Sequence, residues 1–96
     1  MRNNSSKSLG DALRDLTRDL GLSKRLREYD AVGAWAVVVG RHIAGVSEAT
    51  GIRNGVLVVR VSKAPWRQEL LLRKKELIEK VNDHLGETIV RDITLI

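Results

Sequence analysis

Arginine and lysine side chains carry most of the chemistry that this sequence offers, and they are concentrated in one quarter of it. Residues 53–75 hold seven basic residues and one acid, Glu69, which gives the segment a charge of +6 against −1 for the remaining chain. A concentrated positive charge suits an acidic partner such as nucleic acid, whose phosphates bind Arg and Lys whatever the base sequence. The alternative is a solvated basic face that only aids solubility.

Residues of the types used in catalysis and metal binding lack the spacing that such sites need. His42 and His84 are far apart and are not spaced as metal ligands. The chain has no cysteine, which excludes disulfides, zinc sites with Cys ligands and thiol chemistry. Neither phosphate-loop motif, GxxxxGK[ST] or GxGxxG, occurs, and Ser62 lacks the context of a catalytic nucleophile. We therefore expect no enzyme activity, no metal and no cofactor.

Length and composition indicate one small domain with a core of Leu, Val, Ile and Ala, because 96 residues include only three aromatic ones. No apolar run approaches the roughly 20 residues that span a bilayer. The polar start, "MRNNSSKS", has no apolar signal core behind it. We expect a cytoplasmic protein without a membrane segment.

The N-terminal part predicts an amphipathic helix that precedes the domain. Residues 1–7 show no periodicity, and we expect a disordered lead-in there. Ser8 is a suitable N-cap and Gly21 a suitable end for a helix within residues 8–22. Four leucines recur in between at spacings of 4, 3 and 4, which is one helical stripe: Leu9, Leu13, Leu16 and Leu20. The stripe needs a partner surface, either in its own domain or in another chain.

The predicted domain, residues 23–96, opens with a second helix. "AWAVVVG" would also suit a strand, but a long periodicity favours a helix that ends near Gly40, weakened in its middle by Gly33. The residues expected on its buried side are Leu26, Tyr29, Val32, Trp35 and Val39.

A hairpin follows, because Asn54 and Gly55 are the favoured pair of a two-residue type I′ turn, in which both positions need positive φ. In the strand "VLVVRVS" alternate residues share one apolar face, which indicates a sheet covered on one side. A helix capped by Ser62 is expected to run to about Leu85. The last run, "TIVRDITLI", alternates as a closing strand. The order α-α-β-β-α-β predicts an α+β fold with a small three-stranded sheet and helices packed on one face.

The helical projection of residues 62–85 separates the core from the surface. Trp66 lies at the edge of the apolar arc, so we interpret it as a core anchor rather than a stacking platform for a base. Basic residues near the strand-to-helix junction are the predicted nucleic-acid contacts: Arg60, Lys63, Arg67 and Lys74. The predicted contacts with a partner protein are Leu72, isolated on the charged face, and Leu9, Leu13 and Leu16.

Residues 26–96 resemble the DciA-like family of bacterial proteins. The pieces that carry the resemblance, and that we read as fold-defining, include Trp35, Gly40, Asn54, Gly55, Trp66 and Glu69, in "WAVVVG", "NGVLVVRVS" and "WRQEL". The resemblance implies a KH-like fold and a bacterial adaptor that contacts the replicative DNA helicase and DNA, single-stranded or duplex. KH domains that clamp RNA use a GxxG loop between two helices, which this sequence lacks. Two alternatives are a protein-interaction module without nucleic-acid binding and an RNA- or ribosome-associated KH-like factor.

Overall fold

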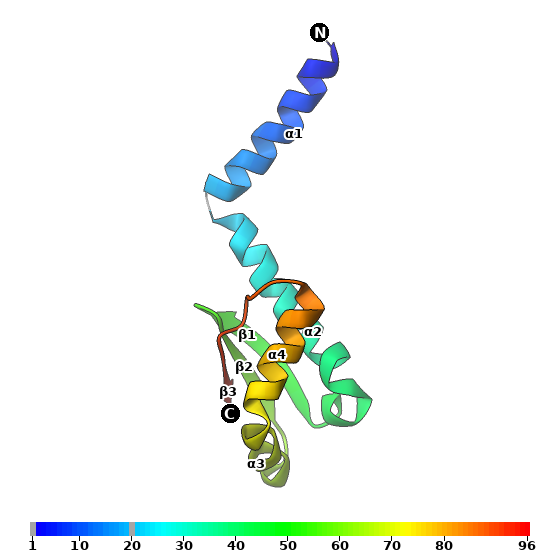
Figure 1. Cartoon of the computed structure of the whole chain (residues 1–96), viewed down its shortest axis with the longest axis vertical. Helices are drawn as coiled ribbons and strands as arrows, with labels where there is room; N and C mark the ends of the chain where they lie inside the picture. The colour runs from blue at the N-terminus through cyan, green and yellow to red at the C-terminus, as the bar shows by residue number, and fades with distance from the viewer. Residues whose placement is uncertain (1, 20) are drawn as a thin grey trace.

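The computed structural model describes residues 2–19 and 21–96, and it describes side chains for residues 8–16 and 21–96. Helix α1 (Arg2–Asp19) points away from the rest of the chain, so the molecule is elongated, with extents of 62 × 23 × 19 Å (Figure 1). The other elements are α2 (Leu22–Ala44), β1 (Ser47–Arg53), β2 (Val56–Val61), α3 (Ala64–Leu72), α4 (Lys74–Leu85) and β3 (Asp92–Leu95).

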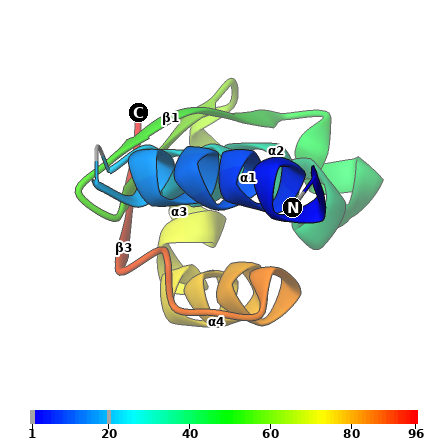
Figure 2. The ribbon, with the colours of Figure 1, turned by 90° about the horizontal axis from the view of Figure 1, so that it is seen from above.

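The sheet has the order β1-β2-β3, with β1 antiparallel and β3 parallel to β2. Asn54 (φ 52°) and Gly55 (φ 80°) form the hairpin turn that the sequence predicts. The apolar side chains of β2 face inward, where α2 and α4 cover one face of the sheet; in Figure 2, α2 lies between β1 and α4. The predicted α+β class is therefore confirmed.

Trp35 of α2 lies at the centre of the core, with 1% of its surface exposed. Its indole Nε1 donates a hydrogen bond to Ser47 Oγ at 3.0 Å, and that hydroxyl donates to the carbonyl of Ile43 at 2.7 Å. The indole N–H is thus satisfied inside the core, which a buried Trp requires. These two hydrogen bonds link the last part of α2 to the first residue of β1.

Helix α2 differs from the prediction in two ways. It runs without a break through Gly33, and it continues past Gly40, which has φ 87° and ψ 166° and makes a kink before a last turn. Leu26 and Tyr29, which we expected to be buried, are 63% and 75% exposed, because the sheet and α4 pack against the side that carries Ala31, Ala34 and Trp35. The periodicity was correct for a helix but did not identify the face that packs.

The prediction of one helix from Ser62 to Leu85 is wrong. The chain breaks at Arg73 (φ −104°, ψ 13°) into α3 and α4, and the N-cap of α3 is Lys63, since the Ser62 hydroxyl instead donates to the carbonyl of Val46. The break changes the helix direction, so a single helical projection does not apply. Leu71, which precedes the break on α3, is exposed.

The closing strand is shorter than expected, because Asn82 of α4 holds the segment before it. Its amide oxygen accepts hydrogen bonds from the N–H groups of Ile89 and Val90, and its amide nitrogen donates to the carbonyl of Val90. Val90 and Ile93 are both buried, which breaks the predicted alternation. Only Asp92–Leu95 pairs with β2 as β3.

Helix α1 begins at Arg2, so Ser8 is not its N-cap as we predicted. Leu9, Leu13 and Leu16 are more than half exposed, whereas Leu20 lies outside the described residues. The side chains of residues 1–7 are also outside them, and the disordered lead-in stays a prediction. Over the described range no helix is long and apolar enough to cross a membrane.

Candidate nucleic-acid interface

A groove of about 450 Å³ lies between α3 and the edge strand β3. It forms where the break at Arg73 turns the chain, so that α3 and the start of α4 border the strand that ends the sheet. The groove is lined by Ala64, Arg67, Gln68, Leu71 and Lys74 from the helices and by Asp92, Ile93, Thr94 and Leu95 from β3.

Arg67 is anchored at one end of this groove. Its Nη2 donates a hydrogen bond to the carbonyl of Val61, the last residue of β2, at 3.1 Å. Its Nε is buried and has no hydrogen-bond partner among the described residues. An orphaned buried donor costs about 1–3 kcal/mol. Arg67 also has no ion pair among the described residues, so its positive charge in the groove is available to an anion.

Lys74 lines the same groove but is paired. Its Nζ lies 3.3 Å from Asp92 Oδ1, and the same carboxylate oxygen accepts a hydrogen bond from the N–H of Ile93 at 2.8 Å. The Ile93 N–H, and then Lys74, hold the pKa of Asp92 below its ordinary value. Asp92 is therefore ionised at neutral pH and competes with any anionic ligand for Lys74.

The other two predicted nucleic-acid contacts lie outside the groove. Arg60 is exposed on the open face of the sheet, directly opposite Glu48 of β1, with 3.8 Å between Nη1 and Oε1. Lys63 is exposed at the N-terminus of α3 and does not line the groove. The structure thus brings Arg67 and Lys74 together around one cavity and does not place Arg60 or Lys63 there.

In the folded structure, acidic residues from outside residues 53–75 neutralise part of the positive charge of this segment. Acids from outside this segment pair with three of its seven basic residues: Glu48 with Arg60, Glu76 with Arg73, and Asp92 with Lys74. Glu76 also pairs with Lys80, which is the main cause of the lowered pKa of Glu76. The other four basic residues of this segment have no ion pair within the described residues: Arg53, Lys63, Arg67 and Lys75.

Trp66 lies on the opposite side of α3 from this groove's lining. It is half-buried, packs against the core and meets the ring of His42 edge-on, with 5.6 Å between centroids. Glu69 beside it is exposed, and Arg73 pairs with Glu76 instead of with Glu69. Leu72 is 75% exposed on α3.

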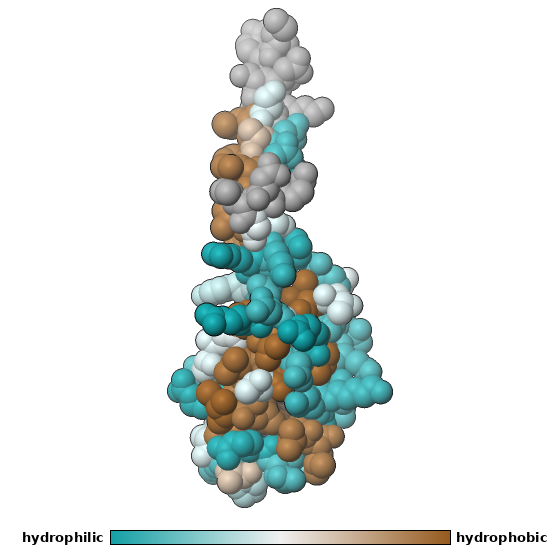
Figure 3. Space-filling view, turned by 90° about the vertical axis from the view of Figure 1, so that its left-hand side faces the viewer, coloured by the Kyte–Doolittle hydropathy of each residue, from teal (hydrophilic) through white to brown (hydrophobic). Residues whose placement is uncertain are grey.

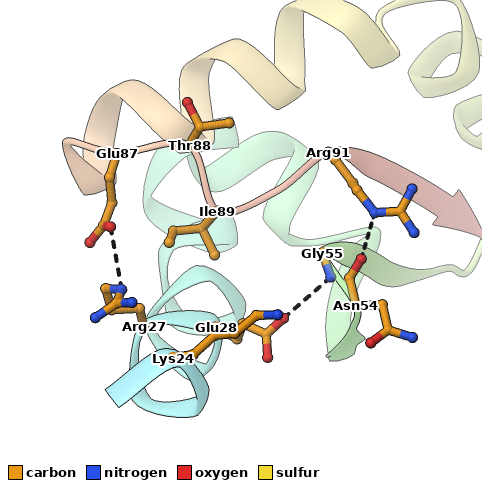
Figure 4. A pocket seen from close by; sticks show the side chains of 9 residues that line it. All are labelled: Lys24, Arg27, Glu28, Asn54, Gly55, Glu87, Thr88, Ile89 and Arg91. Atoms are coloured by element: carbon orange, nitrogen blue, oxygen red, sulfur yellow. Dashed lines mark hydrogen bonds and ion pairs between the residues drawn. The ribbon is translucent and has the colours of Figure 1, made fainter. Parts of the chain in front are cut away.

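A second cavity, which the sequence did not indicate, lies between the start of α2, the hairpin turn and the segment after α4 (Figure 4). Glu28 accepts a hydrogen bond from the N–H of Gly55, and Arg91 donates from Nε to the carbonyl of Asn54 at 2.6 Å. Arg27 forms an ion pair with Glu87 at 3.3 Å. These contacts join segments that are far apart in sequence, so we interpret the cavity as a structural tie.

No group of three or more potential metal ligands occurs in the part of the chain that the structure describes. The groove between α3 and β3 has a different character, with an arginine, a lysine and a carboxylate at a sheet edge. Such a set can bind an anion by charge and hydrogen bonding, and Asp92 limits how strongly.

Comparisons with known proteins cover nearly the whole chain. A family model described as "Dna[CI] antecedent, DciA" matches residues 8–95. A UPF0232 protein of Mycolicibacterium paratuberculosis is 33% identical over 87 residues, which are 91% of this chain and 48% of that protein. The UPF0232 protein of Mycobacterium tuberculosis H37Rv is 32% identical over 91% of this chain and 46% of its own length.

A UPF0232 protein of Mycolicibacterium smegmatis is similar at 30% identity over 92% of this chain and 45% of its own length. The chain therefore spans about half the length of the curated relatives that it matches. The matched range includes most of α1, every strand and the complete groove between α3 and β3. The chain belongs to the DciA family.

Proposed function

We propose that this chain is a non-enzymatic adaptor of bacterial DNA replication that contacts the replicative helicase and DNA, and that it acts in the cytoplasm. Membership of the DciA family supports the association with the helicase. The observation that carries the DNA contact is the convergence of Arg67 and Lys74 on one groove at the edge of the sheet.

The chemistry of this groove suits the phosphate backbone rather than the bases. Arg67 and Lys74 supply charge and hydrogen-bond donors, which bind phosphates without sequence preference. Trp66 packs against the core and meets the ring of His42, and its exposed part lines a separate surface pocket with Pro65, Glu69 and Arg73 rather than this groove. Two groove cations and one carboxylate predict weak binding whose log–log salt slope is only about −2.

Titration with fluorescently labelled DNA at low salt tests the contact. We expect Arg67→Gln and Lys74→Gln each to weaken binding about three- to tenfold and to reduce the salt slope by about one. Lys75→Gln is the matched control, because Lys75 is exposed on α4 and does not line the groove. Equal effects of all three substitutions would reject the groove as the site. Parallel titrations with single-stranded DNA, duplex DNA and RNA show which nucleic acid it prefers.

Leu72 is the proposed contact with the helicase, because it is a large apolar side chain that is 75% exposed next to a half-exposed Leu71. Leu72→Asp should weaken binding to a purified replicative helicase at least about tenfold. Val37→Asp, at a comparably exposed position on α2, should leave it unchanged. A helicase that binds both variants like the original chain would remove Leu72 from the proposal.

A protein-interaction module without direct DNA binding is the second candidate. The ion pairs of Arg60, Arg73 and Lys74 favour it, because they reduce the charge available to phosphates. It predicts helicase binding that resists nuclease and no DNA binding at low salt. The KH-like character stays a prediction; the α3–α4 junction, Leu72-Arg73-Lys74, has no glycine with which to form an RNA-clamping GxxG loop.

A further inference from the structure

Helix α2 is apolar on two opposite sides. Its inner side carries Ala31, Ala34 and Trp35 and packs in the core. Its outer side carries Leu22, Leu26 and Tyr29, at spacings of 4 and 3, and all three are exposed. Large apolar side chains that line up on one exposed side of a helix indicate an interaction surface. The outer stripe is therefore a candidate contact for an additional partner.

A cavity of about 690 Å³ borders this outer stripe, between α2 and the edge strand β1. Its helical wall carries Arg25, Glu28, Tyr29, Val32 and Gly33, and a Cβ added to Gly33 would meet nothing within 4 Å. The space at Gly33 can therefore receive a large side chain from another helix.

Helix α1 presents a stripe with the same spacing. Leu9, Leu13 and Leu16 are exposed along one side of α1, which Figure 3 shows as an apolar band above the rest of the molecule. An isolated helix of this length is marginal in water, so its stability depends on covering such a stripe.

The two stripes match when the helices run antiparallel. Pairing Leu16 with Leu26 places Leu13 opposite Tyr29 and Leu9 opposite the open space at Gly33. In each pair the two residues lie at equal distances from Gly21 in the sequence. Successive pairs therefore form successive layers along two antiparallel helices.

The flanking positions permit this approach. Gly10 and Ala12, beside the stripe of α1, are small and uncharged, so two helix backbones can come close. Arg25 and Asp30, beside the stripe of α2, have opposite charges and introduce no net repulsion. Asp11 and Arg14 form an ion pair at 3.5 Å on the other side of α1.

The open arrangement of α1 and α2 favours a second copy over the chain's own α2. Gly21 adopts φ 73°, and α1 leaves α2 at an open angle rather than folding back along it (Figure 1). Closure within one chain would need a full reversal across residues 20 and 21. An exchange of α1 between two copies covers both stripes of each chain without that reversal.

We propose that α1 of one copy binds the outer stripe of α2 in a second copy, antiparallel, and that the second copy returns the same contact. This dimer is independent of the groove between α3 and β3. The measurement is the mass of the full chain by light scattering across a concentration series. We expect twice the mass of the 10.7 kDa chain at high concentration.

Charge substitutions in one layer provide the decisive test. Leu16→Lys or Leu26→Glu should each weaken the dimer at least about tenfold, because each places a charge in the interface. Both side chains are exposed, so neither substitution removes a core contact, and circular dichroism checks that each variant stays folded. Leu72→Glu is the control, because Leu72 lies on α3, and it should leave the mass unchanged.

Mixing the two variants distinguishes the proposed exchange from other contacts. In the mixed dimer the introduced lysine faces the introduced glutamate in one interface, and the two original leucines meet in the other, so association should return. A wild-type monomer at every concentration, or a mixture that stays monomeric, would overturn the proposal. Since the chain has no cysteine, labels introduced by Ser8→Cys and Ala36→Cys report closure. A monomer with close labels would mean that α1 folds onto its own α2, which also overturns it.

Discussion

Asp92 sets the charge of the groove between α3 and β3. It holds Lys74 at 3.3 Å and is kept ionised by the N–H of Ile93 and by Lys74 itself, both of which lower its pKa. Its charge is therefore complete above the ordinary pKa of a carboxyl and is lost only when the pH falls through its lowered value. Under the proposed function, DNA that binds in this groove around neutral pH has to displace Asp92 from Lys74.

The substitution Asp92→Asn should strengthen DNA binding. The amide oxygen still accepts the Ile93 N–H, but the negative charge is gone and Lys74 is released for phosphate. We expect roughly a two- to fivefold gain in affinity at low salt, since exposed ion pairs are weak. The gain should disappear when Lys74→Gln is combined with it. Unchanged affinity in anisotropy titrations would mean that DNA does not enter this groove.

Asn82 is a residue whose importance the sequence did not indicate. Its three hydrogen bonds with the backbone of Ile89 and Val90 fix the segment that leads into β3. Asn82→Ala should lower the free energy of unfolding by about 2–3 kcal/mol, because it leaves these backbone groups without their partner. Urea denaturation measures this value. Asp83→Ala, an exposed neighbour on α4, should change it by less than about 0.5 kcal/mol.

At the scale of elements, the hairpin turn joins three parts of the chain. Its Gly55 carbonyl accepts the N–H of Arg91, its Gly55 N–H donates to Glu28, and the side chain of Arg91 holds Asn54 (Figure 4). The Asn-Gly signal predicted the turn, because its requirement for positive φ is local. The contacts to α2 and to the segment before β3 are long-range, and no local pattern encodes them.

Gly55→Ala should destabilise the fold by about 1–3 kcal/mol. The position has φ 80°, and an added Cβ would lie 3.0 Å from Cγ of Arg91 and 3.3 Å from the carbonyl oxygen of Ile89. A double-mutant cycle with Arg91→Ala separates these causes: the contact with Arg91 is relieved, whereas the contact with the Ile89 carbonyl and the backbone strain remain. If Gly55→Ala costs nothing in the Arg91→Ala background, positive φ at this turn costs nothing.

At the scale of the whole molecule, the core and α1 are separate. The buried hydrophobic residues of the described chain begin at Ala31, whereas α1 exposes its leucines beyond the domain (Figure 1). Net charge is also a property at this scale. The chain carries a net charge of +5. Glu48, Glu76 and Asp92 each pair with a basic residue of the segment 53–75, so the positive potential around this segment is weaker than its sequence charge suggests.

Deleting residues 1–21 should leave a folded domain. We expect the free energy of unfolding to change by less than about 1 kcal/mol, because no described side chain of α1 belongs to the core. The same deletion should abolish dimer formation and retain DNA binding by Arg67 and Lys74. Urea denaturation and scattering mass measure these outcomes. Loss of the cooperative transition would show that α1 is required by its own domain.

The sequence by itself determined the features that depend on local rules. Positive φ at Asn54 and Gly55, alternation along β2 and helical periodicity before and after the hairpin were enough to predict the α+β class, as all of these act within a few residues. The family resemblance came from the same short pieces.

Only the tertiary structure decided which surfaces meet. The helix break at Arg73 has no glycine or proline beside it from which it could be predicted. The sheet and α4, rather than the sequence pattern of α2, determine which side of α2 is buried. Arg67 and Lys74 share a groove, and Asp92 restrains Lys74, because chain segments distant in sequence pack at one sheet edge. The sequence specifies which charged residues the chain contains. Packing determines where these residues lie and which of them form ion pairs.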